Sequence, residues 1–168
     1  DRSRGLGDVY KRQGYTTMED RGKEDNFSFS QIEMAYYSEH YSDYVINQNK
    51  RHEKARHPDR CKGVEEILKN KKTCPEESIY QLGTIDEHAS VETLIRVFDE
   101  FKKEFDERFG SNVHIIDWSL HMDESTPHIH ERHVFDATNR YGEIEPKQEA
   151  ALEELGFELP NPEKKRSK

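Results

Sequence analysis

The chain has 168 residues, of which 32% are hydrophobic and 36% are charged, and its formal net charge is −9. This composition fits one modest domain with solvated flanks and excludes a large apolar core. The chain contains neither the roughly 18 consecutive apolar residues of a membrane span nor the apolar segment of a secretory signal. We therefore expect a soluble cytoplasmic protein without a membrane partner. The negative charge disfavours general nucleic-acid binding, which needs clustered lysine and arginine.

The two ends of the chain differ in composition from its middle. Residues 1–13 (DRSRGLGDVYKRQ) lack any periodicity and look like a translated sequencing adapter, so we exclude them from fold reasoning as a non-native artefact. Residues 14–30 form a polar lead-in. Residues 160–168 read as a truncated basic linker, because prolines precede a cluster of lysine and arginine. We expect residues 31–159 to be an N-terminally incomplete domain from a longer protein.

Helix signals dominate the first half of this domain. Ser30 is a suitable N-cap for a helix over residues 31–56, and Pro58 should end that helix. A second, short helix is predicted over residues 64–71. A brief strand over residues 78–82 follows, bounded by turn-forming residues.

A basic stretch coincides with the end of the first predicted helix. Between residues 50 and 72, nine basic residues outnumber four acidic ones, and this excess could face a phosphate backbone. The alternative is a solvated helix face, which charge alone favours. The candidate DNA-binding residues in this stretch are Lys50, Arg51, Lys54, Arg56 and Arg60.

The clearest helix signal lies between residues 91 and 109. Ser90 can cap this helix, and Gly110 can end it. Apolar residues repeat there at three- and four-residue spacing, which predicts one apolar face that packs on a sheet. The residues of this face are Val91, Leu94, Ile95, Phe98, Phe101 and Phe105.

The sheet should follow directly. Two extended runs, residues 112–121 and 128–135, flank a six-residue connection that ends in proline, which predicts an antiparallel pair. A final polar helix is predicted over residues 146–155. The resulting fold class is α+β, with a small antiparallel sheet covered by helices.

Three histidines surround the predicted connection between the two strands. His128 and His130 are two residues apart on a strand and so project from the same face, while His121 ends the preceding strand. Pairing of the strands would bring the three imidazoles together. Imidazoles suit divalent transition metals, and three of them leave coordination positions open for water or a phosphate oxygen. The sequence therefore predicts a catalytic type of metal site.

Two acidic residues in the connection could complete this site. Glu124 could bind the metal or act as a base, and Asp123 could orient an imidazole from outside the ligand set. The spacing differs from the HExxH of helical zinc proteases, and no PCxxC of zinc deaminases follows. We read the other histidines, including His133 and His114, as hydrogen-bonded residues without a metal role.

The segment HMDESTPHIH, preceded by VHIIDWSL, resembles the third motif of the Mob/Pre family of plasmid-mobilisation relaxases. That motif reads as His, any residue, Asp-Glu, two residues with Thr-Pro favoured, and then His-x-His. The resemblance is strong at residues 121–130 and diffuse over the rest of residues 31–160.

This resemblance implies a relaxase-like fold of the HUH endonuclease type. It implies site-specific nicking of single-stranded or supercoiled plasmid origin DNA by phosphodiester transesterification, in which a side-chain nucleophile stays attached to the 5′ phosphate. One divalent metal ion is expected, with Mn or Mg favoured and Zn as an alternative. Other readings are a different metal-dependent phosphodiesterase or hydrolase that shares three histidines, and a non-catalytic DNA-binding module. The sequence indicates no oligomeric state.

The sequence departs from the family pattern at the nucleophile. No N-terminal strand with a nucleophile motif is recognisable, and residues 14–30 offer only Tyr15. Four further tyrosines on the first predicted helix read as packing and surface residues: Tyr36, Tyr37, Tyr41 and Tyr44. We assign no nucleophile, and we expect this chain alone to bind metal without nicking DNA at a useful rate.

Overall fold

The computed structural model describes residues 9–10, 28–122 and 125–158. Strands of an antiparallel sheet alternate with helices along this part of the chain. The elements are β1 (Val9–Tyr10), α2 (Phe29–Lys54), a 3₁₀ turn (Pro58–Arg60), α3 (Val64–Lys69), β2 (Glu76–Gln81), α4 (Val91–Phe109), β3 (Val113–His121), β4 (His128–Thr138), β5 (Ile144–Pro146) and α5 (Gln148–Glu154). No described helix combines the length and apolar character that a membrane crossing requires.

The sheet is antiparallel throughout, with the strand order β1-β3-β4-β2, and β5 pairs with the end of β4. The expected α+β class with a small antiparallel sheet is therefore confirmed. Strand β1 lies within the segment that the sequence analysis set aside, and its two residues pair with Leu120 and Ser119 of β3. Strand β5 was not expected. It ends at Pro146, where the last helix was predicted to begin, and that helix starts only at Gln148.

A bulge in β3 determines on which face of the sheet the later side chains of this strand lie. Ile115 pairs with His133, but the next paired residue, Asp117, lies opposite Arg132. Directly opposed residues share a face, and one extra residue moves every later side chain of a strand to the other face. Beyond the bulge, His121 therefore shares a face with its partner His128.

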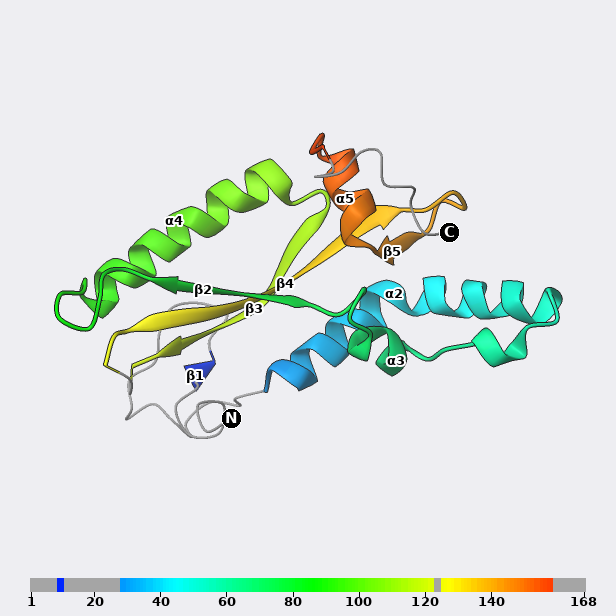
Figure 1. The fold of residues 1–168 in the computed structure, drawn as a ribbon, viewed down its shortest axis with the longest axis horizontal. Helices are drawn as coiled ribbons and strands as arrows, with labels where there is room; N and C mark the ends of the chain where they lie inside the picture. The colour runs from blue at the N-terminus through cyan, green and yellow to red at the C-terminus, as the bar shows by residue number, and fades with distance from the viewer. Residues whose placement is uncertain (1–8, 11–27, 123–124, 159–168) are drawn as a thin grey trace.

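Helix α4 covers one face of the sheet (Figure 1). The Ser90 hydroxyl caps it by accepting a hydrogen bond from the Thr93 backbone N–H at 3.2 Å, as the sequence predicts. The apolar stripe of the helix then packs on alternate residues of β3 and β4, with partly buried Tyr80 and Phe101 at the margin. This buried cluster consists of Leu94, Ile95, Phe98, Trp118, Leu120 and Ile129.

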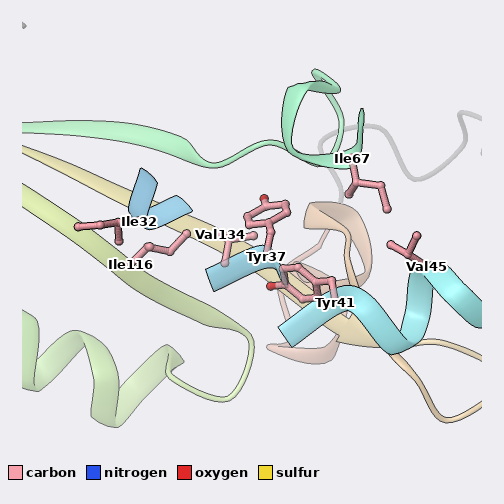
Figure 2. Close-up of a cluster of buried hydrophobic side chains, with 7 residues drawn as sticks. All are labelled: Ile32, Tyr37, Tyr41, Val45, Ile67, Ile116 and Val134. Atoms are coloured by element: carbon pink, nitrogen blue, oxygen red, sulfur yellow. The ribbon is translucent and has the colours of Figure 1, made fainter. Parts of the chain in front are cut away.

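Helix α2 covers part of the opposite face and forms a second core with α3 (Figures 1 and 2). Two of the four tyrosines on this helix, Tyr37 and Tyr41, are fully buried, so tyrosine supplies core volume that aliphatic residues leave empty. The Tyr41 hydroxyl donates a hydrogen bond to Asp136 at 2.9 Å. The cluster drawn in Figure 2 consists of Ile32, Tyr37, Tyr41, Val45, Ile67, Ile116 and Val134.

The N-cap of α2 is Ser28, and the prediction of Ser30 was wrong by half a turn. The Ser28 hydroxyl accepts from the Gln31 backbone N–H at 3.3 Å, and the Gln31 side chain accepts from the Ser28 N–H at 2.9 Å. This reciprocal capping box satisfies two backbone donors at once and so determines where the helix begins. Strand β2 likewise starts at Glu76, two residues before its predicted start.

Candidate metal centre

The three predicted histidines lie together at the end of the β3–β4 hairpin. His121 and His128 are directly opposed across the two strands, and His130 follows two residues later on the same face. The ring centroids are 4.3 Å apart for His121 and His130, 4.9 Å for His121 and His128, and 5.1 Å for His128 and His130. One nitrogen from each ring lies within 4.8 Å of the others, so the cluster can hold a metal ion.

Two of these imidazoles have a defined hydrogen-bond partner on Nδ1. His128 Nδ1 donates to the backbone carbonyl of Thr126 at 2.9 Å, and His130 Nδ1 lies 2.6 Å from a carboxylate oxygen of Glu77. A hydrogen bond at Nδ1 leaves Nε2 to donate its lone pair to a metal. Partners of this kind are what metal-binding histidines usually have.

The carboxylate at His130 belongs to a partly buried chain of charged groups. The second oxygen of Glu77 accepts from Arg132 Nη1 at 2.8 Å, and Arg132 Nε donates to Glu33 at 2.7 Å. Burial tends to raise the pKa of Glu77, but the hydrogen bonds from His130 and Arg132 outweigh it and lower the pKa overall. Glu77 is therefore an ionised acceptor next to the cluster.

The immediate surroundings of the cluster fit a hydrated ion. His121 and His128 are buried, whereas the neighbouring Ile79 of β2, which pairs with His130, is 59% exposed. Within the described part of the chain, the Ser119 hydroxyl on this face is buried and has no hydrogen-bond partner. A buried polar group without a protein partner is commonly satisfied by water or an ion.

The acidic candidates of the connection, Asp123 and Glu124, lie outside the described residues. The other histidines weighed in the sequence have carboxylate partners: His114 lies 2.9 Å from Asp136, and His133 lies 3.1 Å from Glu131. The structure thus brings three histidines together and gives two others local hydrogen bonds.

The basic candidates lie away from the cluster. Helix α2 has 26 residues and is about 39 Å long. Its first turns approach Arg132 beside the histidines, while its last turn, where the basic stretch begins, points to the opposite end of the molecule (Figure 1). Arg51 makes a two-bond ion pair with Glu143 at 2.7 and 2.8 Å. Of the five candidate DNA-binding residues, Lys50, Lys54, Arg56 and Arg60 are exposed.

The tyrosines of α2 are poorly suited to nucleophilic attack. Burial raises the pKa of Tyr37 and Tyr41 far above the ordinary value, and both side chains have no exposed surface. Burial also raises the pKa of Tyr44, to about 12. Their role is packing, as the sequence suggested, and Tyr15 lies outside the described residues.

The charged chain behind His130 was not predicted from the sequence; it consists of Glu77, Arg132 and Glu33. The predicted strand began one residue too late to include Glu77. A usable signal existed, because an antiparallel register that places Ile79 opposite His130 also places Glu77 opposite Arg132. Glu33 had no comparable signal, since its contact depends on how α2 crosses the sheet.

The fold and the cluster define an α+β domain with a three-histidine site, able to hold a metal ion, on one face of an antiparallel sheet. The chain belongs to the Mob/Pre family of plasmid recombination enzymes, whose family model matches residues 21–154. This range includes the whole histidine cluster and both helices that pack on the sheet. No curated protein and no solved structure shows a significant match to the chain.

Proposed function

We propose that the histidine cluster is the metal centre of a relaxase with an HUH-type fold. The substrate is single-stranded or supercoiled plasmid origin DNA, and the reaction is site-specific nicking by transesterification of one phosphodiester. The observation that carries this proposal is the convergence of His121, His128 and His130, with Nδ1 of the latter two engaged by Thr126 and Glu77. Family membership supplies the link to plasmid DNA.

The residues support this chemistry through position and charge. A bound divalent ion, for which Mn or Mg is favoured over Zn, would neutralise charge on a phosphate oxygen. The histidines would hold such an ion on the face of the sheet opposite α4, next to the exposed Ile79. The attacking side chain stays unassigned. Glu124 remains a candidate base or ligand, and Asp123 a candidate partner of an imidazole.

Metal binding tests the first part of the proposal. Titration calorimetry with Mn²⁺ and Zn²⁺ should show one site, and His128→Ala should weaken it by more than about tenfold, because one of three ligands is lost. His88→Ala is the matched control, since His88 is exposed and outside the cluster. Equal affinity in the wild type and His128→Ala would remove the metal centre.

DNA binding separates the proposal from its alternatives. We expect the affinity for a single-stranded origin oligonucleotide, followed by fluorescence anisotropy, to fall when a chelator removes the metal. A DNA-binding module would keep its affinity under chelation. A general phosphodiesterase would instead hydrolyse a small chromogenic diester without DNA. If the protein stays covalently linked to a 5′ end of the DNA after the protein is denatured, the chain already contains a nucleophile.

A further inference from the structure

We propose that Glu77 is a positioning residue for the metal centre. Its carboxylate holds the His130 imidazole in the tautomer whose Nε2 can bind the metal, and Arg132 and Glu33 in turn hold the carboxylate in place. The metal site is thereby tied to the first turns of α2. This inference rests on the proposed metal centre and names residues outside its ligand set.

The sheet register places Glu77 where it can reach His130. Glu77 lies on strand β2 directly opposite Arg132, and His130 is the next residue of β4 on the same face. Diagonal neighbours of this kind are within reach of a long side chain. The resulting contact between Glu77 Oε1 and His130 Nδ1 is 2.6 Å, at the short end of charge-assisted hydrogen bonds.

The second oxygen of Glu77 is occupied, which limits rotation of the carboxylate. Arg132 Nη1 donates to it at 2.8 Å, and Arg132 Nε donates to Glu33 on α2 at 2.7 Å. The side chains of Arg132 and Glu33 are only 17% and 9% exposed, so water competes little for these bonds. The Phe29 ring at the start of α2 also lies 5.9 Å from the Arg132 guanidinium carbon.

The contact with Glu77 determines the tautomer of the His130 imidazole. A neutral imidazole carries one N–H, and a carboxylate can only accept, so the hydrogen bond to Glu77 places that hydrogen on Nδ1. The lone pair then resides on Nε2. His128 is held in the same tautomer by a backbone carbonyl, which no side-chain substitution removes. His130 depends on a side chain, and it is also the least buried histidine of the cluster.

Metal affinity is the first measurement. Glu77→Ala should weaken Mn²⁺ and Zn²⁺ binding about 10- to 100-fold, the usual effect of losing such an outer partner. Glu77→Gln should also weaken binding, since its amide keeps an acceptor oxygen without the charge. Two controls on the same strand should leave affinity unchanged: Ile79→Thr, on the cluster face without a bond to a histidine, and Glu76→Gln, which removes a neighbouring charge.

The tautomer itself is the second measurement, and it requires neither metal nor DNA. In alkaline buffer, where imidazoles are neutral, the ¹⁵N shifts of His130 in the wild type should report the Nδ1–H form. Glu77→Ala should give a mixture of both forms, while His128 keeps its own. A purely structural role of Glu77 would lower thermal stability without altering the His130 tautomer.

The outcomes separate the two proposals. If His128→Ala loses metal affinity while Glu77→Ala keeps both wild-type affinity and an unchanged His130 tautomer, the positioning role is wrong and the metal centre stands. If neither His128→Ala nor Glu77→Ala changes metal affinity, the metal centre itself is wrong. Circular dichroism of each variant confirms that the fold is retained before these comparisons are made.

Discussion

The histidines of this chain are not distinguished by their hydrogen bonds alone. His130 and His133 both have Nδ1 on a carboxylate, but only His121, His128 and His130 converge so that their ring nitrogens could hold a metal ion. A single histidine is therefore weak evidence for a metal site. Convergence with defined outer partners is stronger evidence, because it implies both ligand direction and tautomer.

A single carboxyl group, that of Glu143, should make the folding stability of the protein sensitive to acid. The Arg51 guanidinium, helped by Asn139, lowers the pKa of Glu143 from 4.5 to about 2. A carboxyl group whose pKa is lowered by folding contributes stability above its ordinary pKa, and this contribution disappears as the pH falls from about 4.5 towards about 2. Glu143→Gln should therefore be less stable than the wild type near neutral pH, and the two should converge in acid.

Urea unfolding of both proteins at several pH values between neutral and strongly acidic measures this convergence. Glu65→Gln is a suitable control, because Glu65 forms an exposed ion pair with Lys69 four residues further along α3, and such pairs stabilise little. A stability difference that stays constant from neutral to acid pH would contradict the prediction.

The two faces of the sheet pack against different helices. The bulge in β3 lets Ile116 pack under α2 while Trp118, two residues later, packs under α4. Helix α4 provides a hydrophobic support behind the hairpin that carries the histidines. The histidine cluster thus lies on strands whose reverse side is buried, which favours a rigid arrangement of the three imidazoles.

A pair of adjacent residues in α4 tests this support. Phe98 is 2% exposed, with ring centroids 5.2 Å from Tyr80 and 5.5 Å from Trp118, so Phe98→Ala should cost about 3 to 5 kcal/mol of unfolding free energy. Val97 is 45% exposed, and Val97→Ala should stay within about 0.5 kcal/mol of the wild type. Similar urea midpoints for the two variants would show that α4 does not support the sheet as described.

At the scale of the whole molecule, the histidine cluster lies beyond the first turns of α2, whereas Lys54 and Arg56 lie at the other end of this helix. A strand of DNA that touched both would have to run along the molecule. Arg51 is already paired with Glu143, whereas Lys54 and Arg56 are exposed and available to phosphates. Phosphate contacts at this end of α2 should therefore come from exposed basic residues such as Lys54 and Arg56.

The salt dependence of DNA affinity measures how many phosphate contacts these residues make. Reversal of Lys54 and Arg56 to glutamate should reduce the slope of log affinity against log salt by about 1.4 units, at roughly 0.7 per phosphate contact of a single strand. Lys103→Glu, on α4 and already paired with Glu100, should leave the slope unchanged. An unchanged slope in the double variant would mean that the basic stretch is only a solvated helix face.

The sequence by itself was sufficient wherever the signal was local. The periodicity and caps of residues 91–109 predicted α4 with its bounds, because helix signals lie within a few residues of one another. The spacing of His128 and His130, with proline ending the connection before them, predicted the hairpin and the shared face. The meeting of the three imidazoles in a cluster that could hold a metal ion was predicted from the same residues.

Only the tertiary structure decided the features that depend on distant contacts. The bulge in β3 sets the face of His121, although local alternation along the strand would place His121 with Val113 and Ile115 on the side of α4. The Glu77, Arg132 and Glu33 chain joins residues up to 99 positions apart, so no short pattern contains it. Such contacts arise only when strand register and helix docking are both fixed, and both are set by burial over the whole domain.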